Sequence, residues 1–131
     1  MKTEYVILLI LFIHWVADFL FQSEEMAKNK SKSNKWLAIH VLVYSLVWLI
    51  IGTVVSFFTS EFCVCDVAKF YAITFVCHFI TDYGTSRWTS KLYEDSKFYG
   101  FPSFFSVIGL DQWLHYAQLI VTYDLLKSHL I

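Results

Sequence analysis

Histidine and aspartate residues recur in this sequence at spacings that place them on one face of a helix. A separation of four residues puts two side chains on the same face, about 6 Å apart along the helix axis. Three His and Asp pairs have this separation, and a further histidine stands apart from them. These residues are His14 with Asp18, His78 with Asp82, Asp111 with His115, and the isolated His40.

Imidazole and carboxylate groups together are ligands that suit divalent transition metals. We therefore predict a metal site that takes zinc, with manganese or iron as alternatives. The predicted ligands are Asp18, His78, Asp82, Asp111 and His115. His14 and His40 are predicted catalytic residues, although the spacing leaves open whether each acts as a general base, binds the metal or orients a ligand.

The elements that carry these residues are long apolar blocks. Hydrophobic residues make up 57% of the 131 residues, and charged residues make up 16%. A bilayer core of about 30 Å needs about 20 apolar residues for each helix. Four blocks of this length predict an all-α, integral membrane four-helix bundle in a single domain, residues 1–131. The predicted spans are residues 2–21, 36–55, 68–87 and 107–127.

Basic residues predict the orientation of this bundle. The polar segment 23–35, which is predicted to be a loop, and the segment 87–97 hold seven of the ten Lys and Arg residues. The positive-inside rule places both segments in the cytoplasm and both termini on the periplasmic side of a bacterial inner membrane. The His and Asp candidates then lie in the cytoplasmic half of the bundle, roughly 6–13 Å from the helix ends.

The same His and Asp pairs also allow an interpretation without metal. Such pairs can hydrogen-bond to each other and across helices, and so hold a bundle together. Ionisable groups inside a membrane cost about 2.5–3.5 kcal/mol each on insertion scales, and by default they mark functional sites. Convergence at one depth favours the metal site, and the hydrogen-bonded core stays the alternative.

Charge composition excludes one class of partner. Ten Lys and Arg residues against eleven Asp and Glu residues give a net charge of −1. This balance offers no basic surface for nucleic acid. Membrane lipids are the expected surroundings of the apolar blocks, and a second copy of the chain or a host membrane protein are further candidate partners.

Together, these motifs resemble a family of small bacterial and phage membrane proteins without an assigned activity. The resemblance covers nearly the whole chain and implies a multi-pass helical protein. A fainter similarity, in the His-x3-Asp pairs alone, links the chain to membrane-embedded metal-dependent hydrolases. The motifs are HxxxDFxxQ from His14 to Gln22, the isolated His40, HFITDY from His78 to Tyr83, and DQxxH from Asp111 to His115.

Three functions are compatible with these observations. The first is a small inner-membrane protein that binds a divalent metal near the cytoplasmic leaflet and, as an enzyme, hydrolyses a phosphoester or a lipid. The second is a metal or proton transporter or channel element, in which the same residues form a relay. The third is a non-catalytic membrane protein that acts through a partner and has a structural polar cluster.

Overall fold

The computed structural model describes residues 3–59 and 62–131, and the regular secondary structure in these ranges is entirely helical. This confirms the predicted all-α bundle. The element η1 is a short π-helical turn that continues α1. The elements are α1 (Thr3–Trp15), η1 (Val16–Leu20), α2 (Glu24–Asn29), α3 (Asn34–Phe58), α4 (Val64–Glu94) and α5 (Phe104–Lys127).

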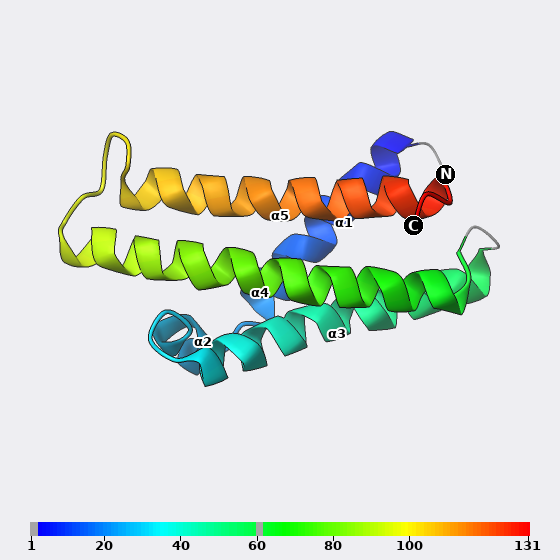
Figure 1. The fold of residues 1–131 in the computed structure, drawn as a ribbon, viewed down its shortest axis with the longest axis horizontal. Helices are drawn as coiled ribbons and strands as arrows, with labels where there is room; N and C mark the ends of the chain where they lie inside the picture. Colours follow the sequence, from blue (N-terminus) through cyan, green and yellow to red (C-terminus); the bar gives the residue numbers. More distant parts are fainter. Residues whose placement is uncertain (1–2, 60–61) are drawn as a thin grey trace.

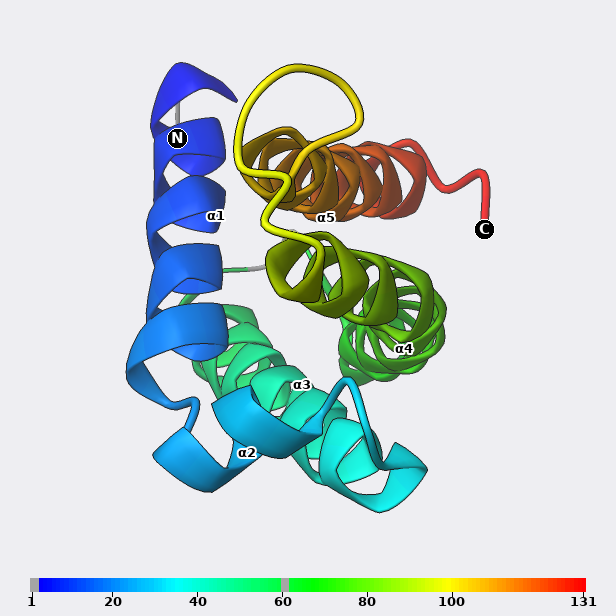
Figure 2. The same cartoon turned by 90° about the vertical axis from the view of Figure 1, so that its left-hand side faces the viewer.

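Helices α3, α4 and α5 run along the long axis of the molecule, and α1 crosses them (Figure 1). In the view along that axis these three helices are seen nearly end-on, whereas α1 is seen from its side (Figure 2). The crossing brings η1 against α3 and α1 against α5. The short helix α2 and the connection between α4 and α5 lie at the same end of the molecule.

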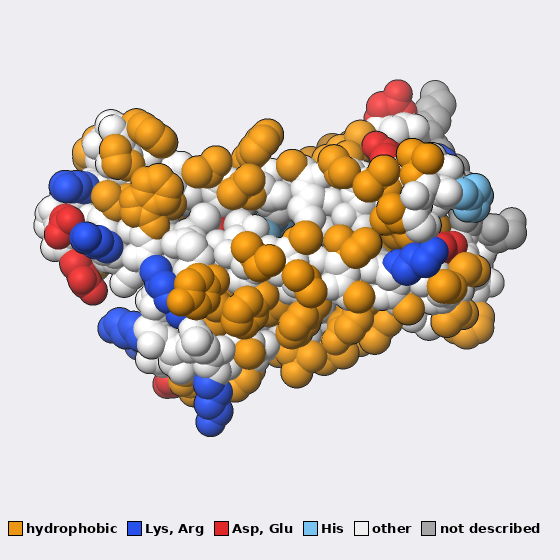
Figure 3. Space-filling model, viewed as in Figure 1, with side chains coloured by type: hydrophobic (Ala, Val, Ile, Leu, Met, Phe, Trp, Pro, Cys, Tyr) orange, Lys and Arg blue, Asp and Glu red, His pale blue; other side chains and the backbone are white. Residues whose placement is uncertain are grey.

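Three helical segments are long and apolar enough to cross a membrane: Thr3–Leu20, Asn34–Phe58 and Val64–Glu94. On the face shown in Figure 3, charged side chains gather toward the two ends of the long axis and hydrophobic side chains cover the middle. This distribution is the one expected of a membrane-spanning bundle. The bacterial inner membrane and the orientation of the termini stay predictions.

The fourth predicted span corresponds to α5, which forms as a helix of 24 residues. The three segments apolar enough to span by composition do not include it, because it carries several polar residues. Two of these, His115 and Thr122, are buried inside the bundle and do not face lipid. The span at α5 therefore stays a prediction. The first predicted span begins at Lys2, which lies outside the described residues.

The segment 23–35 is not the simple loop that its polar composition predicts. Residues Glu24–Asn29 form the helix α2. Ser23 caps this helix, because its hydroxyl oxygen accepts a hydrogen bond from the Met26 N–H at 3.3 Å. The buried Met26 side chain anchors α2 to the bundle, so that the lysines that follow have defined positions.

The π-helical turn η1 interrupts the regular geometry predicted for the first span. The Phe21 N–H donates to the Val16 carbonyl oxygen, five residues back, at 3.1 Å. Such turns are rare and occur frequently at functional sites. This one carries Asp18 and directs it into the bundle, where it is buried.

An apolar core lies beside the polar residues and fixes the helices that carry them. Lipid tails are as apolar as these side chains, so close packing holds the helices together inside a membrane. An apolar cavity of about 250 Å³ adjoins this core, next to Ile10 and Trp48. The core residues are Val6, Ile10, Ile13, Ala17, Tyr44, Trp48 and Leu119.

Candidate metal centre

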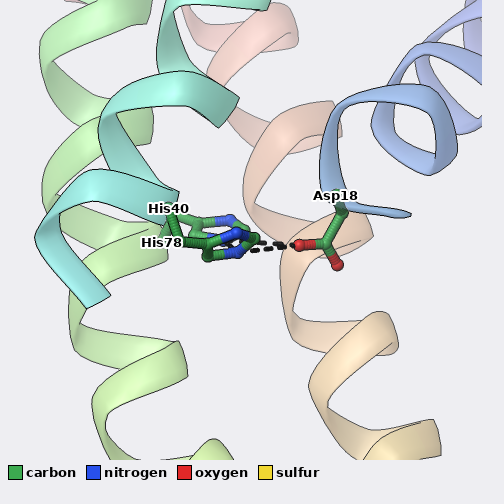
Figure 4. A group of neighbouring side chains, drawn as sticks. All are labelled: Asp18, His40 and His78. Atoms are coloured by element: carbon green, nitrogen blue, oxygen red, sulfur yellow. Dashed lines mark hydrogen bonds and ion pairs between the residues drawn. The ribbon is translucent and has the colours of Figure 1, made fainter. Parts of the chain in front are cut away.

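Two histidines and two aspartates from three helical segments bring their ligand atoms close together. Asp18 comes from η1, His40 from α3, and His78 and Asp82 from α4. All four side chains are buried. Figure 4 shows the rings of His40 and His78 directed at one carboxylate oxygen of Asp18. These four residues are called the inner tetrad below.

Five of the six distances between ligand atoms of the inner tetrad lie near those of a tetrahedral metal site. His40 Nε2 lies 3.1 Å from Asp18 Oδ1, 3.3 Å from Asp82 Oδ2 and 3.2 Å from His78 Nε2. His78 Nε2 lies 3.7 Å from each of the same two carboxylate oxygens. Ligand atoms bound to zinc at about 2.0–2.1 Å in a tetrahedron are about 3.3 Å apart. The arrangement is therefore close to that of a zinc site.

Hydrogen bonds alone do not satisfy the inner tetrad. His40 Nε2 lies within 3.3 Å of four polar atoms, but an imidazole nitrogen offers either one hydrogen or one lone pair. Asp18 Oδ1 is buried and forms no hydrogen bond of good geometry with any residue that the structure describes. A single cation among these atoms would interact with all of them, which favours metal over a purely hydrogen-bonded core.

A second group of ligand atoms adjoins the inner tetrad and shares Asp82 with it. His115 Nε2 lies 3.1 Å from Asp82 Oδ1 and 3.4 Å from Asp111 Oδ1. The Asp111 side chain is 16% exposed and is thus the most accessible of these groups. His115, Asp82 and Asp111 are called the outer triad below.

Aromatic stacking orients one imidazole ring of each group. Tyr44 stacks on His78 with ring centroids 3.9 Å apart, and His78 stacks on His115 with centroids 4.1 Å apart. The ring of His78 is therefore held between two others. Because the rings are already oriented, metal binding would require little further ordering of these side chains.

A chain of hydrogen bonds runs from Tyr44 to two of the carboxylates. The Tyr44 hydroxyl lies 2.8 Å from His14 Nδ1, and His14 Nε2 lies 3.0 Å from Gln112 Oε1. Gln112 Nε2 donates to Asp18 Oδ2 at 3.2 Å and to Asp111 Oδ2 at 3.1 Å. Every link is satisfied when Tyr44 donates to Nδ1 and the Nε2–H of a neutral His14 donates to the amide. His14 thus positions Gln112, which orients both carboxylates.

We expect Gln112→Leu to weaken zinc binding by about 10- to 100-fold, because hydrogen bonds that orient metal ligands have effects of this size. Titration calorimetry of the metal-free protein with zinc measures the change. Gln118→Leu is the matched control, since Gln118 lies on the same helix and donates instead to Thr74 and Thr122. Equal zinc affinity in Gln112→Leu and wild type would show that the amide does not support the site.

Lys30 reaches the inner tetrad from the connection between α2 and α3. Its Nζ lies 2.9 Å from Asp82 Oδ2 and 3.3 Å from His40 Nε2. Burial of the ammonium group lowers the pKa of Lys30, but the carboxylates of Asp82 and Asp18 outweigh this effect and raise the pKa above its ordinary value. Lys30 therefore carries a positive charge beside the tetrad.

A polar cavity of about 150 Å³ lies beside these residues. Its wall includes Lys30, Asp82, Asp111 and the hydroxyl-bearing Ser86. Gln22 Oε1 and Ser86 Oγ are buried there and have no hydrogen-bond partner within the described ranges. A cavity of this size with unpaired polar atoms suits water or a small polar group.

A family model described as "Protein of unknown function (DUF3307)" matches residues 6–130. The chain belongs to the DUF3307 family. No curated protein and no solved structure matches it significantly. The matched part includes the inner tetrad and the outer triad of this DUF3307 protein. The finer details of the predicted motifs and the fainter similarity to membrane hydrolases stay predictions.

The structure of this DUF3307 protein brings the candidate residues predicted from spacing into one region. The five predicted ligands all lie in the inner tetrad or the outer triad. Of the two predicted catalytic residues, His40 lies among the ligand atoms, and His14 lies behind Asp18 with both ring nitrogens in hydrogen-bonding distance of other side chains. The sequence does not identify Lys30 as a site residue, because the segment 23–35 holds four lysines. Only its position directly after α2 brings Lys30, and not the other lysines, to the inner tetrad.

Proposed function

We propose that this DUF3307 protein is a membrane metalloprotein that binds a divalent metal and uses it to hydrolyse a phosphoester or a lipid headgroup. The inner tetrad carries the proposal, because each imidazole nitrogen lies 3.1–3.7 Å from the other and from one oxygen of each carboxylate. Zinc suits this ligand set best, and manganese or iron are the alternatives.

The charges of the buried side chains also support a bound cation. Asp18, Asp82 and Asp111 carry three negative charges when ionised, and Lys30 supplies one positive charge. Metal-binding imidazoles are neutral, so one divalent ion brings the total of the site to zero. Neutralisation offsets the cost of holding carboxylates inside a membrane.

Hydrolysis is the chemistry that a metal would supply at this position. A bound metal lowers the pKa of water so that hydroxide is available near neutral pH. Hydrolysis would join the water oxygen to phosphorus and break the bond from phosphorus to the alcohol oxygen, which would take up the proton that the water had lost. The polar cavity next to Asp82 and Asp111 has room for the phosphoryl group, and Lys30 would attract its charge.

Metal or proton passage across the membrane is the main alternative. It requires polar groups that continue from the site toward the other end of the bundle. Gln118 donates to Thr74 and Thr122, which extends the polar side chains about two turns beyond His115. Further along α4 and α5, the apolar side chains of Phe70, Tyr123 and Leu126 line the apolar cavity. This arrangement favours a site that is closed at this end over a path for metal ions or protons across the bundle.

Elemental analysis of detergent-purified protein tests metal binding. We expect one or two equivalents of zinc, manganese or iron per chain in the wild type, and loss of metal from the double variant His40→Ala, His78→Ala. His129→Ala is the control, because His129 is exposed beyond the end of α5. Circular dichroism in detergent checks that each variant keeps its helices.

If the wild type holds no metal, even after metal is added back, the polar cluster is structural and action through a partner becomes the better function. The hydrolase is tested separately, by phosphate or alcohol release from soluble phosphoesters and from phospholipid vesicles. Metal binding without turnover of any phosphoester would keep the metal site and reject the hydrolase.

A further inference from the structure

The two carboxylate oxygens of Asp82 face two different groups of ligand atoms. Asp82 Oδ2 lies 3.3 Å from His40 Nε2 and 3.7 Å from His78 Nε2, within the inner tetrad. Asp82 Oδ1 lies 3.1 Å from His115 Nε2, within the outer triad. A carboxylate whose oxygens face opposite ligand groups can bridge two metal ions.

We propose that the centre is binuclear, with Asp82 bridging one metal position in the inner tetrad and a second in the outer triad. This proposal rests on the proposed metal-binding function and specifies the number of ions and their ligands. Sites with two ions about 3.5–4 Å apart are typical of phosphatases and nucleases, in which the ions hold both the attacking and the leaving oxygen.

The outer triad has the ligands that a metal position of its own requires. His115 Nε2 lies 3.1 Å from one oxygen of Asp82 and 3.4 Å from one oxygen of Asp111. The ligand atoms of Asp18, Asp111 and His115 also lie within 4.8 Å of one another. Asp18 therefore adjoins the second position, while its Oδ1 faces the first.

The two positions differ in the number of ligands and in how exposed those ligands are. The inner tetrad supplies four protein ligands, as in closed metal sites, and its histidines are no more than 1% exposed. The outer triad supplies three, as in catalytic sites that keep one position for water or substrate. Asp111, the most exposed of these ligands, lines the cavity together with Asp18 and Asp82, so water or substrate in the cavity can reach the open position.

Charge indicates what the open position would bind. Three ionised aspartates, Lys30 and two divalent ions sum to a charge of +2, whereas one ion gives a sum of zero. A site of charge +2 attracts a hydroxide and a phosphoryl oxygen, and it is costly inside a membrane without such anions. A second ion would therefore favour a substrate with an anionic group. Lys30, Gln22 and Ser86 line the cavity that would hold this group.

Gln112 connects the two positions through hydrogen bonds to Asp18 and Asp111. Its amide nitrogen donates to Asp18 Oδ2 and to Asp111 Oδ2. These bonds leave Asp18 Oδ1 facing the inner tetrad and Asp111 Oδ1 facing His115. One side chain therefore orients a ligand of each ion.

Loading with Mn²⁺ alone tests the number of ions and the bridge. Chelator-stripped protein in detergent is incubated with Mn²⁺, desalted and examined by elemental analysis and electron paramagnetic resonance. We expect two equivalents per chain and an exchange-coupled spectrum in the wild type. His115→Ala and Asp111→Asn should each bind one equivalent and give the uncoupled six-line spectrum of a single ion.

Asp111→Asn guards against loss of folding, because it keeps the shape of a partly exposed side chain. Asp124→Asn on the same helix is the matched control and should keep two coupled ions. One equivalent in the wild type, unchanged in both outer-triad variants and lost in His40→Ala, would overturn the second position but leave the proposed metal binding intact. Two uncoupled equivalents would overturn the bridge, and no bound metal in any protein would overturn both proposals.

Discussion

Replacement of Asp82 by asparagine is expected to remove both metal ions from the protein. The carboxylate of Asp82 faces His40 and His78 with one oxygen and His115 with the other, so this single change removes a charged ligand from each position. Loss of one partner from a buried charge pair costs about 3–5 kcal/mol. This corresponds to a loss of at least about 100-fold in affinity at each position.

Elemental analysis and zinc titration of Asp82→Asn measure this loss. Glu94→Gln is the matched control, because it makes the same change of carboxylate to amide at an exposed end of the same helix. Circular dichroism and gel filtration in detergent separate loss of metal from loss of fold. A folded Asp82→Asn protein with the metal content of the wild type would show that Asp82 is not a ligand.

Replacement of Lys30 by methionine is expected to raise the affinity for the first metal ion by at least about tenfold. The ammonium group lies 3.3 Å from His40 Nε2 and 2.9 Å from Asp82 Oδ2, close to where the ion would bind. A divalent ion and a unit positive charge 4 Å apart repel by about 8 kcal/mol at an effective dielectric constant of 20. Lys30 can relieve most of this repulsion by moving into the polar cavity, so only part of it appears as lost affinity.

The same substitution is expected to destabilise the metal-free protein, because Asp82 loses the ammonium group that neutralises it. Thermal unfolding measures both effects. Compared with the wild type, Lys30→Met should have a lower melting temperature without metal, and zinc should raise its melting temperature by a larger amount. Lys28→Met is the control, since Lys28 pairs with Glu24 on the surface. Weaker zinc binding in Lys30→Met would show that the lysine supports the ion instead of competing with it.

Much of the fold follows from the length of the apolar blocks. Each block is long enough to cross a bilayer only as a helix, because unpaired backbone groups are too costly in lipid. Local geometry was less predictable. The hydrophobic pattern does not reveal the π-helical turn at Val16–Leu20. The polar composition of the segment 23–35 predicts a loop where the structure has the helix α2.

The candidate site was predictable where spacing within one helix determines it. The pair His78 and Asp82 shares a helix face, and its two ligand atoms lie 3.7 Å apart. Contacts between helices depend on how the helices pack, and the spacing of residues within one helix does not determine that packing. Only the structure shows that Asp82 faces two groups of ligand atoms. Only the structure shows that Lys30 contacts Asp82, which is 52 residues away in the sequence.

The π-helical turn at η1 sets the direction in which the chain leaves α1. A π-helical turn holds one residue more than an α-helical turn. If Val16–Leu20 wound as a regular α-helix instead, the residues after the turn would be rotated by about 100° relative to α1. The path into α2, and with it the approach of Lys30 to the inner tetrad, therefore depends on this turn, whereas the apolar surface of α1 would suit a membrane either way. In evolution, loss of the turn would separate membrane insertion from metal binding.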